Sequence, residues 1–184
     1  MKKISVVFGV LLFLATSVAP AYCAEKDNII DKNNKYGGKT EEEIYHSGDK
    51  KHENGISKIV EYYDSNNKIV EIVSYYRDIS IIRDGVFKRE QHYKMGKLTK
   101  AEFYYTDEHS RLDGLAKSEI YYDHDEKKTK AEFHYSPAYA EKKVLSKMEV
   151  FYDKEGEAYK RIYYDLSGKM ISTEEKQLEW KTKK

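Results

Sequence analysis

Between residues 57 and 164, polar and apolar positions alternate in short segments that end in two aromatic residues or in His-Tyr. The clearest examples are KAEFYY, KSEIYY, KAEFHY and KMEVFY. Because neighbouring side chains of a strand point to opposite faces, Lys, Glu and the first aromatic residue share one face, and the small residue, the apolar residue and the last Tyr share the other. Adjacent aromatic residues recur without a helical period, so each segment is predicted to be one β-strand of roughly six to nine residues.

The spacing of these segments defines an internal repeat. Their last residues are Tyr63, Tyr76, Tyr93, Tyr105, Tyr122, Tyr135, Tyr152 and Tyr164. The step from one of these tyrosines to the next alternates between a short one of 12 or 13 and a long one of 17, so every two steps sum to 29 or 30. This indicates a repeat of about 30 residues with two similar halves. Weaker copies near Tyr45 and Trp180 extend the array to about ten strands.

The alternating gaps predict an up-and-down meander. The short gaps hold Asp-, Asn- or Gly-rich sequences such as DSNN, KMG, DHDE and DKEG, which are typical of tight turns. The long gaps hold RDISIIRDG, TDEHSRLDG and SPAYAEKK, which we expect to be longer loops at the opposite edge. The expected fold class is all-β, an antiparallel meander of about 8–10 short strands in one strongly twisted or curled sheet. The sequence leaves open whether this sheet stays open or closes into a barrel.

Turn lengths also predict which residues pair across two hairpins. A three-residue loop after Tyr93 that ends in Gly96 and a four-residue loop after Tyr122 keep paired residues on one face. The expected pairs are Glu90 with Lys100, Lys88 with Glu102, Glu119 with Lys130, and Lys117 with Glu132. Opposite charges would then face each other directly, each pair contributing roughly 0.2–1 kcal/mol.

Residues 1–23 resemble a secretory signal peptide. Lys2 and Lys3 precede an apolar run from Ile4 to Ala19, and small residues follow at positions that fit cleavage after Ala21 or Cys23. Residues 24–40 are polar and are expected to be a flexible leader. Residues 41–184 are expected to form the β-repeat domain.

Composition and charge narrow the choice of partners. Removal of residues 1–23 leaves 31 basic and 32 acidic residues, so charge indicates no nucleic-acid partner. The single cysteine, Cys23, excludes an internal disulfide. Membrane contact is expected only if the signal segment is retained or Cys23 is lipidated. The signal segment predicts that the chain is exported and is either periplasmic or extracellular.

The hairpin segments YYDSNNKIV, HYKMGKLTK, FYDKEGEAY and YYDLSGKMI resemble bacterial MORN-variant repeats, whose units read roughly Tyr-Tyr-x-x-Gly-Lys-Leu. The resemblance covers residues 40–175, although the Gly that often begins each strand in that family is missing here. It implies an all-β hairpin array with a binding or scaffolding role and no catalytic residue. A fainter likeness to aromatic cell-wall-binding repeats rests on the aromatic hairpins, although this chain has only one Trp.

The residues point to no catalytic chemistry and to no cofactor. The chain has no Gly-x-Ser-x-Gly motif and no Gly-rich phosphate loop. A glutamate recurs at the same position of successive strands, which is more typical of a row of solvated side chains than of one acid–base pair. His92 and His134 occupy the same repeat position, are expected at opposite ends of the sheet, and are interpreted as surface residues that replace Tyr. No metal site is predicted from these spacings.

The remaining candidates are the outer aromatic residues, which share the face with Lys and Glu. They are Tyr62, Tyr75, Tyr104, Tyr121, Phe151 and Tyr163. Aromatic side chains on strands most often pack against one another, but they can also contact a glycan or an extended peptide. The sequence therefore favours a non-enzymatic protein-interaction or scaffolding module of the cell envelope. The alternative is a protein that binds cell-wall carbohydrate through these rings.

Overall fold

The computed structural model describes residues 34–45, 55–77 and 83–175. The expected signal segment, Cys23 and Trp180 lie outside these residues. The strands are β1 (Gly37–Ile44), β2 (Ile56–Asp64), β3 (Ile69–Tyr76), β4 (Val86–Lys94), β5 (Lys97–Tyr105), β6 (Leu115–Tyr122), β7 (Lys128–Tyr135), β8 (Lys147–Tyr152), β9 (Ala158–Tyr164) and β10 (Met170–Glu175). The helices are α3 (Asp107–Leu112) and α4 (Pro137–Lys143).

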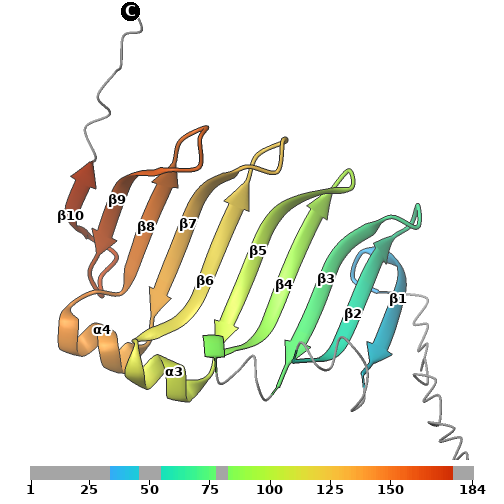
Figure 1. Cartoon of the computed structure of the whole chain (residues 1–184), viewed down its shortest axis with the longest axis horizontal. Coiled ribbons are helices and arrows are strands. Elements are labelled where there is room, and N and C mark those ends of the chain that lie inside the picture. The colour runs from blue at the N-terminus through green and yellow to red at the C-terminus, as the bar shows by residue number, and fades with distance from the viewer. Residues whose placement is uncertain (1–33, 46–54, 78–82, 176–184) are drawn as a thin grey trace, which may run out of the picture.

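The strands form one antiparallel sheet in which each strand pairs only with its neighbours in the sequence (Figure 1). The order runs from β1 to β10, so the all-β meander predicted from the sequence is confirmed. The sheet is not closed, and β1 and β10 form its two edges within the described part of the chain. β1 begins at Gly37, so the leader boundary expected at residue 40 lies inside this strand.

All three long connections were expected to be loops. Two of them instead contain short helices, α3 and α4, at one edge of the sheet (Figure 1). The hydroxyl of Thr106 accepts a hydrogen bond from the amide of His109 at the start of α3. Ser136 caps α4 in the same way, with Pro137 in the first turn. Ser and Thr are favoured helix caps, and Pro is favoured in the first turn, so this signal was present in the sequence.

The pairing predicted for both hairpins is wrong by two residues. Glu90 lies opposite Glu102 and not Lys100, and Glu119 lies opposite Glu132 and not Lys130. Lys88 lies opposite Tyr104, and Lys117 lies opposite His134. The face of each residue is as predicted, because a shift of two residues preserves the face.

The shift has two causes. The β4–β5 turn is one residue shorter than expected and the β6–β7 turn one residue longer, and each hairpin contains a β-bulge. Between β4 and β5 the turn contains only Met95 and Gly96, both with positive φ, as two-residue hairpin turns require. The pairing then slips by one residue at Thr99. The other tight hairpins, β2–β3, β6–β7, β8–β9 and β9–β10, show the same irregularity just after the turn. A bulge adds one residue to one strand, and sequence periodicity alone did not reveal it.

The sheet is a single layer with two distinct faces. The face that carries Lys, Glu and outer aromatic residues is here named the charged face, and the opposite one the apolar face. No large side chain among the described residues is completely buried, and the most deeply buried apolar residues are small: Ala101 and Ala131 are 0% and 1% exposed. Apart from α3 and α4 at one edge, no described helix or strand covers either face (Figure 1). None of the described helices has the length and apolarity needed to cross a membrane.

Candidate functional site

Glutamates form a central row across the charged face. Glu90, Glu102, Glu119, Glu132 and Glu149 lie directly opposite one another on the five consecutive strands β4–β8. Val60 and Val73 continue the row on β2 and β3, and Ile162 continues it on β9. Like charges at directly opposed positions are unfavourable, so the neighbouring side chains must compensate them.

Two outer rows supply this compensation by alternating lysines with aromatic residues. The row nearer the helices contains Lys58, Tyr75, Lys88, Tyr104, Lys117, His134, Lys147 and Tyr164. The row nearer the tight turns contains Tyr62, Glu71, His92, Lys100, Tyr121, Lys130, Phe151 and Lys160. The order follows from the motif: Lys-x-Glu-x-aromatic is centred on Glu, so antiparallel pairing sets Glu against Glu and Lys against an aromatic residue.

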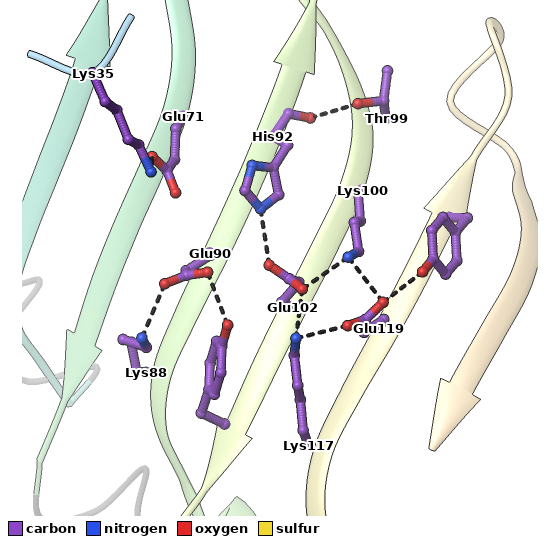
Figure 2. A network of polar contacts seen from close by, with 12 residues as sticks. Lys35, Glu71, Lys88, Glu90, His92, Thr99, Lys100, Glu102, Lys117 and Glu119 are labelled. Carbon is purple, nitrogen blue, oxygen red and sulfur yellow. Dashed lines mark hydrogen bonds and ion pairs between the residues drawn. The ribbon is translucent and has the colours of Figure 1, made fainter. Parts of the chain in front are cut away.

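The lysines bind glutamates both along and across strands (Figure 2). Lys100 lies 2.8 Å from Glu102 on its own strand and 2.8 Å from Glu119 on the next. Lys117 contacts the same two carboxylates, each at 2.7 Å. His92 adds a contact of 3.0 Å to Glu102. The Lys-x-Glu motif therefore does bring unlike charges together, by diagonal and same-strand contacts.

These contacts control the ionisation of the row. Burial alone would raise the pKa of Glu102, but hydrogen bonds from Lys100 and Lys117 outweigh it and hold the pKa well below its usual range. At Glu119, burial again acts to raise the pKa and the same two lysines again outweigh it, so this pKa is lowered as well. Burial and the hydrogen bond to Glu119 raise the pKa of Tyr121 to about 12. At neutral pH Glu102 and Glu119 are therefore ionised and paired with lysines, and Tyr121 is neutral.

The outer tyrosine rings are also contacted by the lysines. Tyr104 has the ammonium groups of Lys88 and Lys117 at 4.0 and 5.1 Å from its ring centroid. Tyr121 has those of Lys100 and Lys130 at 5.3 and 4.7 Å. Such cation–π contacts use the ring face, which is also the surface that a sugar ring would need for stacking. The geometry thus disfavours, at these two rings, the stacking mode of a carbohydrate binder.

The N-terminal end of the charged face is covered by the chain itself. Glu71 on β3 is 2% exposed and takes the lysine position of the motif. Lys35 lies 2.7 Å from its carboxylate, and the Tyr36 hydroxyl donates a hydrogen bond of 2.9 Å to it. The Tyr36 ring also meets Tyr62 edge to face. Nothing in the sequence indicated this contact, because Lys35 and Tyr36 belong to the segment expected to be a flexible leader.

Five of the six candidate contact residues lie on the charged face as expected, namely Tyr62, Tyr75, Tyr104, Tyr121 and Phe151. Tyr163 does not, because it lies opposite Met148 on the apolar face. Its neighbour Tyr164 lies opposite Lys147 and takes the place expected for it. After its bulge, β9 has one residue fewer than β5 or β7, so alignment on the last Tyr assigned the wrong face.

Two groups on the charged face each contain two glutamates and a histidine. They are Glu71, Glu90 and His92, and Glu119, Glu132 and His134, and in each group the candidate ligand atoms lie within 4.8 Å of one another. Carboxylate and imidazole ligands suit zinc or manganese. However, lysine ammonium groups contact all four glutamates, so a cation would have to displace them. Sequence spacing missed both groups because each draws residues from two strands.

The apolar face carries two principal rows in its central part. The first, from β3 to β8, contains Ile72, Gln91, Ala101, Ile120, Ala131 and Val150. The second contains Ser74, Arg89, Phe103, Ser118, Phe133 and Met148. Large and small residues alternate along much of both rows, and Phe103, Ile120 and Phe133 are only half-buried. An exposed apolar surface of this extent is a common mark of an interaction site.

The apolar face is hollowed near its tight turns, where a pocket of about 510 Å³ lies between the first two hairpins. Tyr63, Ile69, Ile72, Tyr93 and Met95 contribute to its lining. Its walls contain no acidic residue and no histidine. The pocket therefore offers apolar contact and little acid–base chemistry.

No protein-family model matches the chain, and no curated protein matches it. Among solved structures, the chain is similar to a crystal structure of a mutant TarM from S. aureus in complex with Fondaparinux, alpha-GlcNAc-glycerol and UDP. The two are 16% identical with a TM-score of 0.31, over 74% of this chain and 19% of that one. A further crystal structure of TarM gives 15% identity and a TM-score of 0.30, over 73% and 19%. The chain thus spans about a fifth of these proteins, and similarities this low carry no conclusion about function.

Proposed function

We propose that this chain is an exported, non-enzymatic β-repeat protein that acts as a protein-interaction or scaffolding module of the cell envelope, with the apolar face as its docking surface. The observation that carries the proposal is the half-buried row of Phe103, Phe133 and their neighbours on a face that the described elements cover only at one edge, by α3 and α4. Burying such a surface is the main driving force of protein association.

The charged face supports this assignment by being the less available surface. Its carboxylates are bound by lysines, and the lysines also contact tyrosine rings. A ligand there would have to replace contacts that already exist, whereas a partner on the apolar face would replace only water. The same pairing leaves no carboxylate of the central pair, Glu102 and Glu119, free for acid–base catalysis.

Site-specific photocrosslinking tests the docking surface. A photoreactive phenylalanine analogue replaces Phe133 on the apolar face or, as a matched control, Phe151 on the charged face. The proposal expects protein crosslinks in the envelope from position 133 and few from position 151. Protein crosslinks confined to position 151 would contradict the apolar face as the docking surface. Sedimentation of the protein with cell-wall polysaccharide, without protein crosslinks from either position, would favour the carbohydrate-binding alternative.

Export is tested on the processed protein. Cleavage after Ala21 or Cys23, the two positions that fit the signal pattern, would give a mature chain that begins at Tyr22 or Ala24. N-terminal sequencing of protein recovered from the envelope or the medium checks this. Recovery of the unprocessed chain from the cytoplasm alone would contradict export.

A further inference from the structure

We propose that the occupant of the apolar face is a second copy of this chain, so that two open sheets stack face to face as a symmetric sandwich. The inference rests on the proposed function, because it takes the apolar face as a docking surface. It adds the identity of the partner and the orientation in which that partner binds.

The pattern of residue sizes fits a second copy. A two-fold axis parallel to the strands, placed between β5 and β6, sets β5 over β6 of the other copy and β4 over β7. In the central layer Ala101 then faces Ile120, and Phe103 faces Ser118. One strand further out, Gln91 faces Ala131. Large side chains thus meet small ones on β5 and β6, as close packing between two sheets requires. Further out the match is partial, because Arg89 faces Phe133 and Ile72 faces Val150.

One polar side chain on this face also gains a partner. The Arg89 Nε atom is buried and has no hydrogen-bond partner, and its guanidinium lies 5.3 Å from the Phe103 ring. In the stacked arrangement Arg89 faces Phe133 of the second copy. An arginine between two aromatic rings is a favourable arrangement, so Arg89 does not oppose the interface.

Charge selects the orientation of the second copy. On β1 and β2 the apolar face carries Glu41, Glu43 and Glu61, of which Glu41 lies 2.6 Å from Lys39. On β9 it carries the half-exposed Arg161, which lies 3.6 Å from Glu174 on β10. Stacking with reversed strand order sets Glu61 over Arg161 and also sets Glu41 over Glu174. Stacking with the same strand order also sets large residues over small ones, but it places the acidic end over itself. The reversed order is favoured because only it offsets its like-charge contact with an opposite-charge contact, Glu61 over Arg161.

The size of the face is sufficient for a stable complex. The eight strands β2–β9, spaced about 4.8 Å apart and paired over roughly six residues, present about 750 Å² per copy. A standard protein–protein interface buries about 800 Å² on each partner. These eight strands therefore provide about the area that a specific dimer needs.

The test compares two matched Ile→Glu variants of the processed full-length product. Ile120→Glu places a carboxylate near the centre of the apolar face, whereas Ile162→Glu places one on the charged face, at the end of the glutamate row. We expect wild type and Ile162→Glu to be dimers by light scattering coupled to size exclusion. Ile120→Glu should weaken dimerisation by about 100-fold, because two unpaired carboxylates would be buried. Circular dichroism checks that each variant retains its β-structure.

A charge-reversal cycle tests the orientation independently of core folding. Glu61→Arg and Arg161→Glu should each weaken the dimer several-fold, and the double variant should recover most of the loss. A wild type that stays monomeric at about 100 µM, or a dimer that is insensitive to Ile120→Glu, overturns the inference. A monomer that still crosslinks to another protein through position 133 overturns only the inference and leaves the proposed function standing. A monomer without crosslinks overturns both.

Discussion

Replacement of Glu102 by Gln should destabilise the protein, and the structure gives the scale of the effect. The carboxylate of Glu102 is contacted by Lys100 at 2.8 Å, Lys117 at 2.7 Å and His92 at 3.0 Å. Hydrogen bonds to charged groups are worth about 1.5–3 kcal/mol each. Both lysines keep their contacts with Glu119, however, and the change relieves repulsion between neighbouring glutamates. The expected net loss in the free energy of unfolding is therefore about 2 kcal/mol, close to the contribution of one such bond.

Urea unfolding followed by circular dichroism measures this loss. A change of about 2 kcal/mol should lower the urea midpoint by roughly 1 M for a domain of this size. Glu175→Gln is the matched control, because Glu175 also binds one lysine, Lys160, at 2.7 Å but is 61% exposed. Its midpoint should stay at the wild-type value, since exposed pairs contribute little. If Glu102→Gln is as stable as wild type, the ion network does not stabilise the fold, as is known for some buried ion pairs.

Three further changes test other parts of the fold. Gly114→Ala should lower the free energy of unfolding in urea by about 1–3 kcal/mol more than Gly156→Ala does. Both glycines have positive φ, but only at Gly114 would the new Cβ overlap the Tyr139 ring. Equal losses for the two variants would contradict the packing of Tyr139 on Gly114. Ser136→Ala should cost about 1 kcal/mol by loss of the α4 cap, measured in the same way. Burial acts to raise the pKa of Glu149. Hydrogen bonds from Lys147 and Tyr164 act in the opposite direction and outweigh it, so the folded-state pKa of Glu149 is depressed. This stabilisation is complete above about pH 4.3 and is lost as the pH falls through the folded-state value, so urea midpoints at pH 7, 4 and 3 should decrease in that order.

The face assignment could be predicted from the sequence because it depends only on alternation along each strand. Lys100, Glu102 and Tyr104 lie on one face, and Ala101 and Phe103 on the other, as the pattern KAEFYY indicates. The meander order followed in the same way from the alternation of short and long connections. Both inferences use local regularities that tertiary structure has little freedom to override.

The pairing between strands could not be predicted in the same way, because it depends on the conformation of single residues. A two-residue turn and a three-residue turn after Tyr93 are both compatible with Gly96, and the bulge at Thr99 follows no obvious sequence signal. The shorter strand β9 changed the face of Tyr163 for a similar reason. The caps of α3 and α4, in contrast, were present in the sequence as Thr106 and as Ser136 followed by proline.

The corrected pairing explains why the two faces differ in their need for a partner. On the charged face each strand supplies a lysine, a glutamate and an aromatic residue, or a substitute for one of them, and antiparallel pairing lets adjacent strands satisfy one another. Adding a strand extends this set of contacts. On the apolar face, neighbours in the same layer bury the small Ala101 but leave the larger Phe103 and Ile120 partly exposed, so each added strand enlarges the exposed apolar area. The longer the array, the stronger the drive to cover this one face, so the repeat itself favours association through the apolar face.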